Sequence, residues 1–274
     1  MVFKKMLSAL GVGGPSVDTV LDGSRVRPGE SLRGHVHIVG GKNPAEIEHV
    51  ALGLVTRVEV ESGDHEYDTQ VEFHRMPVAG AITLAPDEQQ AIPFRLPVPW
   101  ETPITSVYGQ HLRGMTMGLR TELSVAGAID KSDLDPVAID PLPAQERILA
   151  AFGELGFQFK NADLERGHLR GVHQRLPFYQ EIEFYPPSYA RGINEIEVTF
   201  VAAPLGMDVI LEVDKRGGVF SSGRDAYGHL RVDYATAAQT DWTAQVDKWF
   251  RGTLQRRPAG LGARGFGQLG FGQL

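Results

Sequence analysis

The sequence predicts an all-β protein with two β-sandwich domains in tandem, and three observations support that fold class. Short segments with an apolar residue at every second position recur along the chain, as in strands with one buried face. The 32 glycines and 17 prolines among 274 residues are typical of many turns between short strands. An acidic segment that begins at Asp130 separates the alternating segments into two groups.

Alternation in the first group is clearest over residues 50–60. There Val50, Leu52 and Leu54 can face a core, while the positions between them become charged toward the end of the segment. Similar alternation occurs over residues 32–38, 71–73 and 119–129. Five prolines between residues 86 and 103 indicate edge strands and extended loops.

The second group repeats the same pattern. Ile196, Val198 and Phe200 alternate with polar side chains, and comparable runs lie at residues 178–184 and 209–214. These patterns predict an N-terminal β-sandwich domain over residues 1–129, a linker over 130–141, a C-terminal β-sandwich domain over 142–257 and a disordered tail over 258–274.

Three short helices are expected besides the strands: one over residues 3–10, one after the linker from Pro143, and one near the C-terminus. The last carries an apolar stripe at helical spacing, formed by Trp242, Val246, Trp249, Phe250 and Leu254. We expect this helix to dock on the second domain, since aromatic stripes are usually core contacts. The alternative is a partner-binding patch that includes Trp242, Trp249 and Phe250.

The two ends of the chain suggest further contacts. The tail repeats Gly-Phe-Gly-Gln-Leu, so Phe266 and Phe271 are candidate partner-binding residues of a bivalent motif. At the N-terminus, Phe3, Lys4, Lys5 and Leu7 are candidate membrane contacts. The apolar face of so short a helix binds lipid weakly. A packed terminal helix is therefore the favoured interpretation, and a peripheral membrane protein is the alternative. No run reaches the roughly 18 apolar residues of a membrane span.

Composition narrows the class of partner. The net charge of −7 disfavours nucleic acid, because an acidic surface repels phosphate. The absence of cysteine excludes disulfides and thiolate metal sites and fits a cytoplasmic protein. Protein partners are therefore expected, and self-association stays open.

Patterns typical of enzymes and of cofactor or metal sites were not found. The chain has no nucleophile elbow, phosphate loop or zinc-protease motif, so we predict no catalytic residue and no cofactor. His35 and His37 could share one strand face, but without a clear third ligand they indicate solvated histidines rather than zinc. Asp130, Asp133 and the two later aspartates of the acidic segment miss the spacing of a calcium loop. A metal-dependent ligand-binding sandwich is the less favoured alternative.

Several strings, in order along the chain, resemble the bacterial sporulation-control family often called SpoOM. They are Phe3-Lys4-Lys5-Met6-Leu7 with Gly11, Val17-Asp18-Thr19, Val26-Arg27-Pro28-Gly29-Glu30, Gly40-Gly41, Leu155-Gly156-Phe157, Ala162-Asp163-Leu164-Glu165, the segment 176–184, Asp214-Lys215-Arg216 and Asp241-Trp242. The resemblance implies an arrestin-like pair of β-sandwiches, no known catalytic residues, and a regulatory role in sporulation or development through protein contacts.

Overall fold

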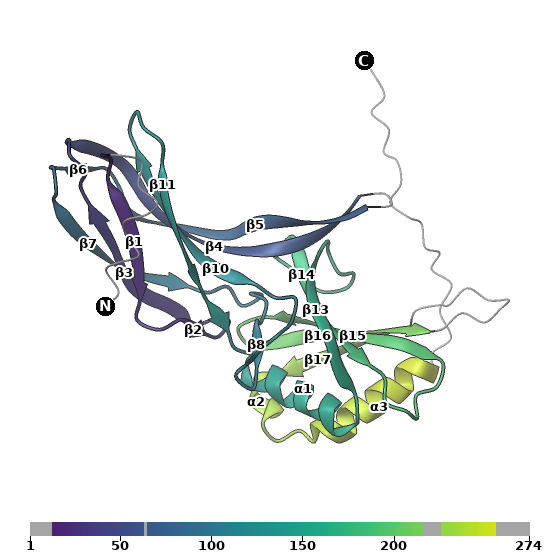
Figure 1. The fold of residues 1–274 in the computed structure, drawn as a ribbon. Helices are drawn as coiled ribbons and strands as arrows, with labels where there is room; N and C mark the ends of the chain where they lie inside the picture. Colours follow the sequence, from purple (N-terminus) through teal and green to yellow (C-terminus); the bar gives the residue numbers. More distant parts are fainter. Residues whose placement is uncertain (1–12, 63–64, 216–225, 256–274) are drawn as a thin grey trace, which may run out of the picture.

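The computed structural model describes residues 13–62, 65–215 and 226–255, most of which lie in strands. The first half of the chain forms two packed sheets (Figure 1). One sheet contains β1 (Ser16–Leu21), β3 (Ser31–Val39) and β7 (Gln89–Pro97). The facing sheet contains β4 (Ala45–Ser62), β5 (His65–Ala79), β6 (Ile82–Leu84), β10 (Met117–Val125) and β11 (Lys131–Pro136). Two short pairs complete this half: β2 (Arg25–Val26) with β12 (Ala138–Ile139), and β8 (Ser106–Val107) with β9 (Gln110–His111).

The alternating positions form the core of this sandwich, as the sequence predicts. Val36 and Ile38 of β3 are buried in the same core as Leu52 and Leu54 of β4 and Leu119 of β10. Side chains alternate between the two faces of a strand. β3 therefore buries one row and leaves the other partly exposed, whereas β4 is buried on both faces over residues 50–56.

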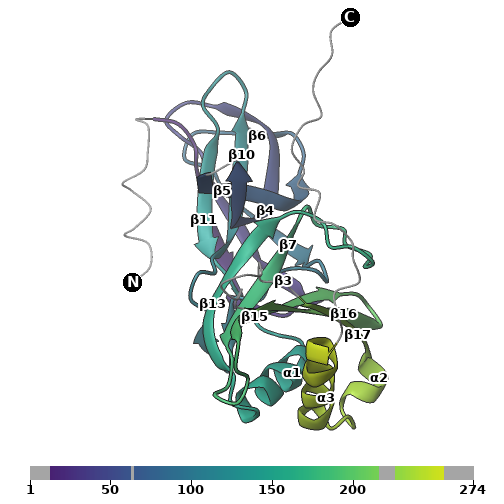
Figure 2. The same ribbon diagram turned by 90° about the vertical axis from the view of Figure 1, so that its right-hand side faces the viewer.

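The second half is one antiparallel sheet backed by helices. Its strands are β13 (Gln158–Arg166), β14 (Phe178–Tyr185), β15 (Ile193–Ala202), β16 (Gly206–Lys215) and β17 (Ala226–Asp233). Helices α1 (Pro143–Glu154) and α3 (Trp242–Gln255) pack on one face of this sheet, and α2 (Tyr234–Ala237) precedes α3 (Figure 2). The sequence predicts a second β-sandwich here, and the described residues correct that prediction. Helices cover the face of the sheet on which a second sheet was expected.

The closing helix docks on this sheet, which confirms the docking prediction. Trp242, Val246 and Phe250 are buried, and the ring of Phe250 meets that of Phe157 edge-on at 5.2 Å. Trp249 is partly buried over β17, where Gly228 leaves room for its indole ring: a Cβ there would lie 2.5 Å from the indole nitrogen. The predicted helix over residues 3–10 and the tail over 258–274 lie outside the described residues.

The expected linker is part of the first half, which corrects the predicted boundary. Residues 131–136 form β11, the strand beside β10 at the sheet edge. Asp133 accepts a hydrogen bond from the backbone N–H of Thr19 at 2.8 Å, and Asp140 pairs with Arg25. The segment resembles a solvated linker in sequence, but Asp133 and Asp140 have partners more than a hundred residues away that hold it in the fold.

The two halves are joined through β4, β13 and a loop of the first half. One parallel residue pair, Glu59 opposite Glu165, connects β4 to β13 and makes the large sheet continuous. The side-chain amide of Gln180 in β14 also binds the backbone of Ile104 in a loop of the first half. It accepts a hydrogen bond from the N–H of Ile104 at 3.0 Å and donates one to the carbonyl of Ile104 at 2.8 Å. Both bonds are buried, so Gln180 acts as a latch between the halves.

Removing this latch should weaken the junction. Gln180→Ala leaves a buried N–H and carbonyl of Ile104 without their partner, and we expect a loss of about 1–2 kcal/mol in the free energy of unfolding. Urea unfolding followed by circular dichroism measures it. Gln89→Ala, at an exposed position of β7, is the control. Equal stability of Gln180→Ala and Gln89→Ala would show that the latch contributes nothing.

Candidate functional site: the acidic face of the second sheet

The face of the second sheet that points away from the helices is lined with carboxylates. In β14, Gln180, Ile182 and Phe184 are buried on the helix side, while Glu181 and Glu183 point to the opposite face. The neighbouring strands follow the same alternation. We call five of these residues the acidic cluster: Asp163, Glu165, Glu181, Glu197 and Glu212.

Strand register places the carboxylates of different strands beside one another. Asp163 of β13 lies opposite Glu181 of β14, and Glu197 of β15 lies opposite Glu212 of β16. Like charges in directly opposed positions destabilise a sheet. Bound protons, a cation or a basic partner each lower the electrostatic energy of such opposed pairs.

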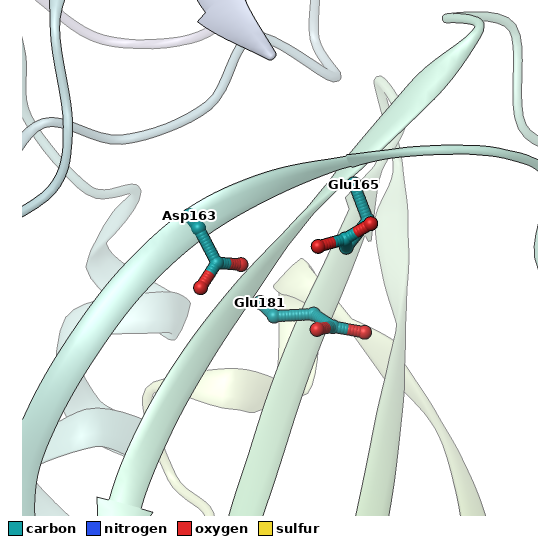
Figure 3. A group of neighbouring side chains, drawn as sticks. All are labelled: Asp163, Glu165 and Glu181. Carbon is teal, nitrogen blue, oxygen red and sulfur yellow. The ribbon is translucent and has the colours of Figure 1, made fainter. Parts of the chain in front are cut away.

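The side chains of the acidic cluster converge. Asp163, Glu165 and Glu181 point toward one another from two neighbouring strands (Figure 3). One carboxylate oxygen from each of these residues lies within 4.8 Å of the others, and Glu181, Glu197 and Glu212 form a second such group. Glu181 belongs to both groups and is thus the centre of the cluster.

A lysine, Lys160, lies at the border of the acidic cluster. Lys160 of β13 forms ion pairs with Glu183 at 2.5 Å and with Glu195. Both partners lie next to the cluster. Burial and neighbouring carboxylates raise the pKa of Glu197, and attraction to Lys160 offsets a small part of that rise. Lys160 therefore neutralises the border of the acidic face more than its centre.

Burial and mutual repulsion raise the pKa values of the cluster. Burial, followed by the charges of Glu197 and Asp163, raises the pKa of Glu181 to about 9. Burial and then a hydrogen bond with Glu183 raise the pKa of Asp163 to about 8. The pKa of Glu197 rises to about 7, through burial and then Glu212. At neutral pH the cluster consequently holds protons that isolated carboxyls would have released.

The structure does not bring the metal candidates of the sequence together into one site. The rings of His35 and His37 lie 6.2 Å apart, and neither joins a group of three potential ligands in the described residues. Asp130 accepts a hydrogen bond from the backbone of Val125. Burial raises the pKa of Asp135 to about 6, with the nearby Asp133 as the next cause.

The partner-binding candidates fall into two groups. Trp242 and Phe250 are buried, so in this conformation they are core residues rather than a contact surface, and Trp249 is partly buried against them. The tail residues Phe266 and Phe271 lie outside the described residues. So do the candidate membrane contacts Phe3, Lys4, Lys5 and Leu7.

Sequence reasoning missed the acidic face, although a signal for it exists. Glutamates and aspartates occupy alternate positions in the segments that became β13 to β16: 163 and 165, 181 and 183, 195 and 197, and 212 and 214. Each segment alone is an ordinary strand with one solvent-exposed face. Only the pairing of the four strands places these exposed faces on the same side of one sheet.

The fold and this face define a mostly β protein with a sandwich in its first half and a helix-backed, carboxylate-rich sheet in its second. The chain belongs to the Spo0M family, since the model described as SpoOM protein matches residues 3–217. It is 36% identical over 216 residues to the sporulation-control protein Spo0M of Bacillus subtilis strain 168, covering 78% of this chain and 81% of that protein. The crystal structure of Spo0M from Bacillus subtilis superposes with a TM-score of 0.77 at 30% identity, covering 88% of this chain and all of that chain.

These similarities confirm the family that the sequence strings indicate. Among the helices in the described ranges, none combines the length and apolar character needed to cross a membrane.

Proposed function

We propose that this protein is a cytoplasmic, non-enzymatic regulatory adaptor in the control of bacterial sporulation or development, and that it binds protein partners through the acidic face. The name of the Bacillus subtilis relative, a sporulation-control protein, supports the regulatory role. The observation that carries the contact surface is the acidic cluster. A lysine- or arginine-rich segment of a partner would neutralise its crowded carboxylates and displace their shared protons.

The acidic face suits the binding of a cationic partner because its carboxyls lie close together and repel one another when they are ionised. Three of its carboxyls have raised pKa values, so each gains from an approaching positive charge. Charge complementarity of this kind mainly sets specificity and association rate. Binding should therefore weaken with salt.

A crosslinking pull-down from cells tests the proposal. We expect the wild-type chain to recover defined protein partners, and the variant Glu181→Gln with Glu197→Gln to lose most of that recovery. Glu46→Gln with Glu48→Gln is the matched control, because both positions are exposed in the first half and the same two carboxyl groups are replaced by amides. Equal recovery by the wild type and the Glu181→Gln, Glu197→Gln variant would contradict the acidic face as the contact surface.

Two further measurements separate the alternatives. Elemental analysis of the purified protein tests the metal-dependent alternative. Stoichiometric metal in the wild type that is lost in the Glu181→Gln, Glu197→Gln variant would favour it. The acidic cluster, rather than His35 and His37, would then supply the ligands. Liposome flotation of the full chain beside one lacking residues 2–10 tests the membrane alternative. Flotation that depends on those residues would favour it.

A further inference from the structure

Three arginines and two histidines are concentrated where β13 ends and the connection to β14 begins. We call residues 166–175 the basic loop. Its charged and titratable side chains are all exposed: Arg166, His168, Arg170, His173 and Arg175. The basic loop contains no carboxylate, although the whole chain has a net charge of −7. It is therefore a local positive surface on an acidic protein.

Within the described ranges, the arginines of the basic loop have no ion-pair partner. The arginines that do form ion pairs in these ranges lie elsewhere: Arg25, Arg57, Arg75, Arg120 and Arg251. Arg166 follows Glu165 in β13, so its side chain points to the face of the sheet opposite the acidic cluster. The positive charge of the basic loop is therefore available to a ligand from outside the chain.

Hydrogen bonds constrain the backbone of the basic loop. The side-chain carbonyl of Gln174 accepts a hydrogen bond from the N–H of Leu169 at 2.9 Å, and its amide nitrogen donates one to the carbonyl of Gly167 at 2.8 Å. Glu101 of the first half accepts a hydrogen bond from the N–H of Arg175 at 2.7 Å. The exposed arginine side chains are thus carried by a preorganised backbone, which lowers the entropy cost of binding.

We propose that the basic loop is a second contact surface, which binds a short acidic segment of a protein partner. Guanidinium groups bind carboxylates through two parallel hydrogen bonds. The partly buried Leu169 and Val172 lie between the arginines in sequence and can contact apolar side chains of the same segment. A long polyanion such as nucleic acid would also meet the negative charge of the rest of the protein and be repelled. This contact goes beyond the acidic face of the proposed function and does not depend on it.

Fluorescence anisotropy with a labelled synthetic peptide and the full chain tests the proposal. In this peptide pairs of glutamates alternate with leucines, and a matched peptide has glutamine in place of every glutamate. We expect the chain to bind the acidic peptide but not the glutamine peptide, and the affinity to fall as salt rises. The triple variant Arg166→Gln, Arg170→Gln, Arg175→Gln should bind about tenfold more weakly, or by about 1.4 kcal/mol, because three exposed ion pairs are lost.

A second triple variant is the matched control. Arg33→Gln, Arg191→Gln, Arg231→Gln removes the same charge from exposed positions outside the basic loop, and it should bind the acidic peptide like the wild type. Circular dichroism confirms that both triple variants are folded. Equal affinity of the two triple variants would overturn the proposal, because net charge rather than the basic loop would then set binding. Failure of the wild type to bind the acidic peptide would overturn it as well.

Two further measurements separate this contact from others. The Glu181→Gln, Glu197→Gln variant should bind the acidic peptide at least as tightly as the wild type, so a failure of the acidic face as a contact surface would leave this result unchanged. Flotation with vesicles of phosphatidylserine and phosphatidylcholine tests a membrane surface. Flotation that the basic-loop variant loses, without binding of the acidic peptide by the wild type, would replace the acidic segment with an anionic lipid surface.

Discussion

Replacing Phe250 with alanine should lower the free energy of unfolding by about 3–5 kcal/mol, since a large side chain leaves a cavity in a packed core. The ring of Phe250 is 1% exposed and contacts that of Phe157 at 5.2 Å. A helix of the length of α3 is marginal in water without such packing. The loss would be a large part of a typical stability of about 5–15 kcal/mol. Thermal and urea unfolding measure it.

The same helix offers the control for this prediction. Lys248 lies two residues away and is exposed, so Lys248→Ala keeps helix propensity and should change stability by less than about 0.5 kcal/mol. If Phe250→Ala melted like Lys248→Ala, α3 would not depend on its apolar stripe for docking. The stripe formed by Trp242, Trp249 and Phe250 would then return as a partner-binding candidate.

Local patterns in the sequence predict the elements of this fold well. Alternation places Leu52 and Leu54 in the first core and Val198 in the second, and the stripe through Phe250 predicts the buried face of α3. These patterns succeed because the period of buried positions depends only on whether the segment is a strand or a helix.

Arrangements that depend on contacts between residues far apart in the sequence cannot be predicted from such local patterns. The segment beginning at Asp130 has the composition of a linker, but Asp133 is held by the N–H of Thr19 and the segment pairs with β10. The acidic cluster is a second case, because Glu181 and Glu197 become neighbours only through strand register. Whether helices or a second sheet cover an apolar face is likewise decided by chain topology.

The stability of this protein should fall as pH rises from about 4 to about 9, and Glu181→Gln should remove much of that fall. Burial and neighbouring carboxylates raise the pKa of Glu181 to about 9 in the folded chain, whereas an unfolded glutamate titrates near pH 4.3. The folded state thus binds more protons than the unfolded state between these values. The stabilisation is complete below the unfolded pKa and is lost as pH rises through the folded pKa.

Thermal unfolding of wild type and Glu181→Gln across this pH range measures the effect. The variant should be more stable than wild type by on the order of 3 kcal/mol at about pH 9, and nearly equal to it at about pH 4. Glu122→Gln is a control of opposite sign, because a hydrogen bond from Arg75 lowers the pKa of Glu122. That variant should lose about 1 kcal/mol at neutral pH and approach wild type in acid. Parallel pH profiles for wild type and Glu181→Gln would mean that Glu181 ionises as an ordinary solvated carboxyl, and the acidic face would then lack the electrostatic strain from which a cationic partner gains.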